Sequence, residues 1–169
     1  MTTPFSYEHT FQAPSIDVLL RAFTDPSHIA AQDATNGVAS RTVVERVDDA
    51  ARFFCECRVA TKRELPAFVQ KLAGGGLAYT ERLRWDKASD TIAIEIRPDV
   101  MGGRSKIDVA CRIVPAGEGR VKRIYAGTAT VEVALIGGRI EKSIVTEIGK
   151  TLDAAARTTQ AWLDGKHVP

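Results

Sequence analysis

Residues 140–163, IEKSIVTEIGKTLDAAARTTQAWL, decide the fold of this 169-residue chain. Apolar side chains recur every three or four residues from Ile140 to Leu163 and form one continuous stripe. The opposite side carries the charged residues Glu141, Lys142, Glu147, Lys150, Asp153 and Arg157. The spacing predicts one long amphipathic helix, and its stripe needs an apolar surface to cover.

That surface is predicted by the residues that precede the helix. Apolar and polar side chains mostly alternate there, which is typical of half-buried strands. We expect about seven strands, at Phe5–Phe11, Val38–Val47, Arg52–Ala60, Leu77–Asp86, Thr91–Arg97, Ser105–Val114 and Val121–Leu135. Short connections rich in Gly, Asp and Ser favour antiparallel hairpins between them.

Shorter helices are predicted at two places. After the first strand, Ser15 precedes an apolar stripe over Ile16–Phe23, and Asp25 with Pro26 is a typical start for a second short helix. Between two strands, Leu65–Leu72 has helical spacing and is followed by Gly74–Gly76. This segment is either a hinged lid over a pocket or a fixed helix at one end of the core.

The order of elements indicates an α+β domain that spans residues 1–169. A curved antiparallel sheet wraps round the C-terminal helix, with two short helices after the first strand. A sheet curved round one helix leaves a gap at its open end, and an apolar gap of this kind is the first candidate for a binding site.

The first predicted strand is followed by Ala13-Pro14, Val18, Ala22 and Thr24-Asp25-Pro26. In this pattern the chain resembles the START-like superfamily, also called the helix-grip or SRPBCC fold. More narrowly, the chain is similar to a bacterial START-like family of unknown function at Glu64-Leu65-Pro66, Tyr79–Trp85 and Leu135–Lys142. The resemblance implies a helix-grip fold. It transfers no catalytic residue, because the superfamily includes lipid carriers, polyketide cyclases and co-chaperones on one scaffold.

Alternation along the strands, and the stripe of the long helix, predict which side chains face the pocket. The predicted lining is Tyr7, His9, Phe11, Cys57, Phe68, Leu72, Tyr79, Glu81, Leu83, Ile94, Val109, Tyr125, Ile144, Ile148 and Leu152. Most of these side chains are apolar, which indicates a hydrophobic ligand.

Three of them could move protons if the protein is an enzyme. His9 is either a pocket acid or base or a hydrogen-bonded core histidine, and Glu81 is either a pocket carboxylate or half of a cross-strand ion pair. Tyr125 shares a strand face with Arg123, and this pair either reads the polar end of a ligand or belongs to a solvated face.

Composition and motifs argue against several other classes of function. Lys and Arg total 23 and Asp and Glu total 21, so a net charge of +2 offers no footprint for nucleic acid. No apolar run approaches the length of about 20 residues that a membrane helix needs. No cofactor or metal motif occurs, and Cys55 and Cys57, two apart on one strand, are expected to stay reduced. We therefore expect a cytoplasmic protein without cofactor or metal, as a monomer or weak homodimer.

Three functions are compatible with these patterns. The first is the binding or carriage of a lipid-like or polycyclic small molecule without catalysis. The second is a cyclase or dehydratase acting on a polyketide-like substrate, with His9, Glu81 and Tyr125 as the acting groups. The third is a co-chaperone-like interaction module that works through the charged outer face of the sheet.

Overall fold

The computed structural model describes residues 2–62 and 77–166. Within these ranges seven strands form one sheet, in the order β1-β7-β6-β5-β4-β3-β2, and every neighbouring pair is antiparallel. The strands are β1 (Thr2–Gln12), β2 (Val38–Asp48), β3 (Arg52–Thr61), β4 (Ala78–Asp86), β5 (Thr91–Pro98), β6 (Ser105–Pro115) and β7 (Arg120–Val131). The predicted antiparallel sheet is confirmed.

The described helices are α1 (Ile16–Ala22), α2 (Pro26–Thr35), the 3-10 turn η1 (Val100–Gly103) and α4 (Gly137–Leu163). Helix α2 begins as the sequence predicts, because the Asp25 carboxylate accepts hydrogen bonds from the backbone N–H groups of Ser27 and His28. The predicted helix over Leu65–Leu72 lies outside the described residues.

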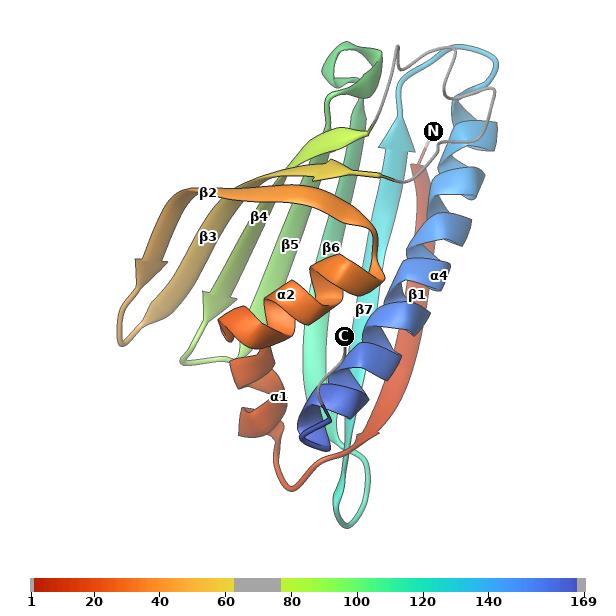
Figure 1. Cartoon of the computed structure of the whole chain (residues 1–169). Coiled ribbons are helices and arrows are strands. Elements are labelled where there is room, and N and C mark those ends of the chain that lie inside the picture. The colour runs from red at the N-terminus through yellow and green to blue at the C-terminus, as the bar shows by residue number, and fades with distance from the viewer. Residues whose placement is uncertain (1, 63–76, 167–169) are drawn as a thin grey trace.

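Figure 1 shows how the helices cover the sheet. Helix α4 runs beside β1 and β7, and α1 and α2 lie on the same side of the sheet as α4. Strands β2 and β3 curve away at the opposite edge of the sheet. This arrangement confirms the helix-grip fold, with one long helix held against one side of a curved open sheet.

The apolar stripe of α4 packs on the sheet along its length. Near its start, Ile144 and Ile148 contact a cluster built on Phe5, Ile107 and Ala129. Further along, α4 contacts a larger cluster through Leu152, Ala156 and Leu163. The pattern read from residues 140–163 therefore corresponds to the buried face of the helix.

The expectation that Glu141 lies on the charged outer side of the helix is wrong, because this carboxylate ties the first turn of α4 to the sheet. Glu141 is 0% exposed, and it accepts hydrogen bonds from the backbone N–H of Val131 (2.9 Å) and the hydroxyl of Thr3 (2.8 Å). Gly137 lies so close to β7 that an added Cβ would be 2.5 Å from the carbonyl oxygen of Val131. The start of α4 thus requires a small residue at position 137 and a buried hydrogen-bond acceptor at position 141.

The last strand ends earlier than the sequence predicts. We expected it to continue to Leu135, but β7 ends at Val131. Leu135 adopts a positive φ of 67° and is fully exposed, in a turn that the backbone N–H of Gly137 closes by bonding to the carbonyl of Val133. Val133 and Leu135 are apolar and two residues apart, as in a strand, although the chain turns there into the helix.

Candidate functional site

A cavity of about 680 Å³ lies between the sheet and the helices α2 and α4. Every second residue of the inner strands reaches it, as at Tyr79, Glu81 and Leu83 on β4, because alternate side chains of a strand share one face. The cavity lies within the range of about 300–1,000 Å³ that holds drug-sized ligands. The curvature of the sheet and the position of α4 therefore create space for a small molecule.

The structure places most of the predicted lining around this cavity. The residues that line it as expected are Cys57, Tyr79, Glu81, Leu83, Ile94, Val109, Tyr125, Ile144, Ile148 and Leu152. They come from strands β3 to β7 and from α4. Phe68 and Leu72 lie outside the described residues.

Three predicted residues lie elsewhere, because α4 covers the inner face of β1. The Tyr7 hydroxyl donates to the carbonyl of Val145 (2.8 Å), and His9 Nε2 lies 2.8 Å from Asp153 Oδ1. Phe11 is buried in the main apolar cluster. Tyr7, His9 and Phe11 thus fix β1 to its surroundings and do not line the cavity, so His9 is not available as a pocket acid or base.

The cavity reaches the surface at β2. Val43 lines it while 53% exposed, and Arg46 lines it with a side chain that is 44% exposed. Both residues lie on the edge strand that curves away from the rest of the sheet (Figure 1). The cavity therefore opens at this edge of the sheet.

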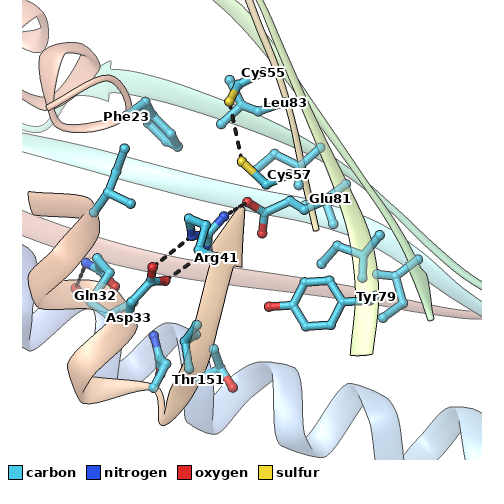
Figure 2. Close-up of a pocket in the computed structure, with 18 of the residues that line it drawn as sticks. Phe23, Gln32, Asp33, Arg41, Cys55, Cys57, Tyr79, Glu81, Leu83 and Thr151 are labelled. Carbon is cyan, nitrogen blue, oxygen red and sulfur yellow. Dashed lines mark hydrogen bonds and ion pairs between the residues drawn. The ribbon is translucent and has the colours of Figure 1, made fainter. Parts of the chain in front are cut away.

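A cluster of charged side chains crosses one wall of the cavity (Figure 2). Arg41 binds both oxygens of Asp33, with Nε–Oδ2 at 2.8 Å and Nη2–Oδ1 at 2.9 Å, and its Nη1 lies 2.7 Å from Glu81 Oε1. Burial acts to lower the pKa of Arg41, but the two carboxylates outweigh it and raise that pKa. Glu81 therefore forms an ion pair, as one of the two sequence-based alternatives predicted, and also lines the cavity.

A second charged group, Arg123 on β7, belongs to the buried part of the cavity lining. Arg123 is 3% exposed, and its guanidinium lies 4.8 Å from the ring centre of Phe11 and 5.1 Å from that of Tyr125. Burial raises the pKa of Tyr125, and it raises the pKa of the Cys111 thiol to about 12, so both groups are neutral at pH 7. Arg123 and Tyr125 are buried, which rules out the solvated-face alternative.

Two features of the lining could not be predicted from any pattern in the sequence. His28 is buried, with Nδ1 2.8 Å from the carbonyl oxygen of Ala22 and Nε2 3.0 Å from Thr159 Oγ1. Burial lowers the pKa of His28 to about 4. The pairing of Arg41 with Asp33 joins a strand to a helix, and only the fold brings these residues together.

The cysteines on β3 both line the cavity. Their sulfur atoms lie 3.5 Å apart and both thiols are free (Figure 2). Burial and the neighbouring Cys57 raise the pKa of Cys55 to about 11, so it is a thiol at neutral pH. Within residues 2–62 and 77–166, no group of three or more His, Cys, Asp or Glu side chains is placed to hold a metal ion.

Comparison with known proteins assigns the family. The model of a family described as "Protein of unknown function (DUF2505)" matches residues 6–163. The chain belongs to this family. No curated protein matches it. In the part of the chain that the structure describes, no helix is both long enough and apolar enough to cross a membrane.

Solved structures show which fold the family member adopts. The ZhuI aromatase/cyclase from Streptomyces sp. R1128 is 13% identical, with a TM-score of 0.70 over 97% of this chain and 94% of that one. A START superfamily protein from Mycobacterium smegmatis is 15% identical (TM-score 0.61; 96% and 97%). A conserved protein from Geobacillus kaustophilus is 11% identical (TM-score 0.66; 98% of both). These similarities establish a START-like fold.

Proposed function

We propose that this DUF2505 protein is a single START-like domain that binds and carries a hydrophobic small molecule, lipid-like or polycyclic, in the cavity between its sheet and α4. One observation carries the proposal: a cavity of about 680 Å³ opens beside Val43 and is lined mostly by aliphatic and aromatic side chains. Burial of apolar ligand surface there is favourable by roughly 25 cal/mol per Å².

The charged cluster of the wall supports a binding role over a catalytic one. Arg41 occupies both oxygens of Asp33 and one oxygen of Glu81. A carboxylate oxygen that accepts a hydrogen bond from arginine is already occupied by that donor. The cluster therefore joins α2 to the sheet, and proton transfer to Oε1 of Glu81 would require that oxygen to leave Arg41.

Native mass spectrometry of the freshly purified protein tests this proposal first. We expect a species heavier than the polypeptide, whose extra mass is released when the protein is denatured. Binding of the neutral dye Nile red then shows whether the cavity accepts an apolar molecule. A protein that carries no extra mass and does not bind the dye would contradict the proposal.

A matched pair of variants shows whether the dye occupies the cavity. Leu83 lines the cavity, while its neighbour Arg84 lies on the outer face, paired with Glu95. Leu83→Trp fills the cavity, and we expect it to weaken Nile red binding at least roughly tenfold. Arg84→Trp adds the same side chain outside and is expected to leave dye binding unchanged.

One observation favours an enzyme as the second candidate. Glu81 and Tyr125, two of the three residues expected to act in a cyclase or dehydratase, line the same cavity. In this reading the neutral Tyr125 hydroxyl donates a proton or hydrogen bond and Glu81 accepts one. Conversion of a polyketide-like substrate that is lost in both Glu81→Gln and Tyr125→Phe, while Nile red binding is kept, would favour it over simple carriage.

A further inference from the structure

The guanidinium of Arg123 is buried, and two of its three nitrogen atoms make no hydrogen bond in the described part of the chain. Its Nη1 donates to Thr159 Oγ1 at 3.4 Å. Its Nε and Nη2 have no hydrogen-bond partner among the residues that the structure describes. A buried charge without a partner is costly, and such groups are normally paired. The donors of Arg123 therefore call for an acceptor that the described chain does not supply.

Within the described residues, the groups that pack directly against Arg123 carry no negative charge. Its neighbours Tyr125, Cys111 and His28 are all neutral at pH 7, because burial disfavours their charged forms. In residues 2–62 and 77–166, no carboxylate forms an ion pair with Arg123. The aromatic rings of Phe11 and Tyr125 lie under the guanidinium and stabilise its charge, but they supply no oxygen or nitrogen acceptor for Nε and Nη2.

Another arginine in the same cavity shows what these two donors bind. Arg41 uses Nε and Nη2 to hold both oxygens of Asp33, at 2.8 and 2.9 Å (Figure 2). These atoms form one edge of the guanidinium, and their spacing matches the two oxygens of a carboxylate. Arg123 presents the same edge without a partner. The missing acceptor has the geometry of a carboxylate.

We propose that the ligand of the cavity is an amphipathic carboxylic acid whose carboxylate accepts hydrogen bonds from Nε and Nη2 of Arg123. The proposal rests on the proposed function, because it names the class of ligand that the same cavity carries. Arg123 and Tyr125 both line the cavity, and so do the aliphatic side chains of Val109 and Ile94. The apolar body of the ligand lies against these aliphatic residues, and its acidic end points to β7.

The ligand must expose the charged edge as it binds. Nε and Nη2 of Arg123 are inaccessible to water in the empty protein, and Tyr125 is the aromatic neighbour that both lines the cavity and packs near the guanidinium. We expect the Tyr125 ring to shift when the carboxylate enters. This exchange favours an acid over a neutral ligand, because a neutral head group cannot compensate the buried charge.

Displacement of Nile red by matched probes tests the proposal. The probes are dodecanoic acid against dodecanol, and 2-naphthoic acid against 2-naphthalenemethanol, each pair differing in the acidic group. We expect the acid of at least one pair to bind roughly tenfold tighter than its alcohol, or better. This is the difference in affinity that hydrogen bonds to a charged group produce. Arg123→Met should remove this preference while Nile red still binds. Arg84→Met is the control and should keep the preference, because Arg84 lies on the outer face of the sheet, paired with Glu95.

Each outcome bears on one proposal or on both. If Nile red binds but neither acid binds tighter than its alcohol, or if the preference survives in Arg123→Met, the carboxylate proposal is wrong and the carrier function stands. If neither the dye nor any probe binds, both fail.

A second measurement needs no variant. Dodecanoic acid labelled with ¹³C at its carboxyl reports its own pKa through the ¹³C NMR signal. Arg123 should lower the pKa of the bound acid below that of the free acid. An unchanged or raised pKa would also overturn the carboxylate proposal.

Discussion

The buried imidazole of His28 should make the stability of this protein depend on pH. Its Nδ1 donates to the carbonyl of Ala22, and its Nε2 accepts from the amide of Gln32 at 3.1 Å, whose other bond to the carbonyl of Ala155 fixes its orientation. Both ring nitrogens are thus used by the neutral form. Burial, together with the nearby charge of Arg123, lowers the pKa of His28 from 6.5 to about 4.

The sign of the effect follows from the two pKa values. The folded protein binds the proton more weakly than the unfolded chain, so folding is favoured fully above pH 6.5, and this contribution is lost as the pH falls toward 4. Between pH 7.5 and pH 4.5, linkage gives a loss of about 2.5 kcal/mol in the free energy of unfolding from this one group.

Urea unfolding at the two pH values measures this loss. The fluorescence of Trp162 reports the transition directly, because its ring centre lies 5.2 Å from that of His28. Other groups titrate in the same interval, so the comparison is with His28→Gln, which keeps an amide donor and cannot be protonated. We expect the free energy of unfolding of the unchanged protein to fall by about 2 kcal/mol more than that of the variant. If the free energy of unfolding falls equally in both proteins, His28 is not the group that causes the loss.

Two substitutions on α4 test how the helix is held. Glu141→Ala leaves the buried N–H of Val131 without an acceptor, so the free energy of unfolding should fall by about 3 kcal/mol, against less than about 0.5 kcal/mol for the exposed Glu147→Ala. Thermal melts of both variants measure the difference, and equal melting temperatures would contradict the role of Glu141. Gly149→Ala places a Cβ 2.8 Å from the Tyr7 hydroxyl oxygen and should cost about 1–3 kcal/mol in urea unfolding, whereas an unchanged midpoint would show that α4 can shift.

The architecture could be predicted because its signals are periodic and local. The stripe from Ile140 to Leu163 marks α4, and alternation marks the strands. Periodicity says only that a side chain points inward and not which element covers it. His9 has the pattern of an inward-facing residue, but α4 lies over β1, and the imidazole meets Asp153 instead of the cavity.

The polar part of the site could be predicted only in outline. Glu81 and Tyr125 were found from the faces of their strands, and both line the cavity. The partner of Glu81 could not be found, because Arg41 lies two strands away, with β3 between them. The importance of Arg123 depends on what fails to contact it, and an unmade hydrogen bond becomes visible only in three dimensions.

A crystal structure of the freshly purified protein would show whether the cavity holds a ligand. We expect electron density from a bound molecule inside the cavity, running from the β2 edge at Val43 toward Tyr125 and Arg123. Side chains that close this space from the sheet to α4, with no room for a ligand, would contradict this expectation.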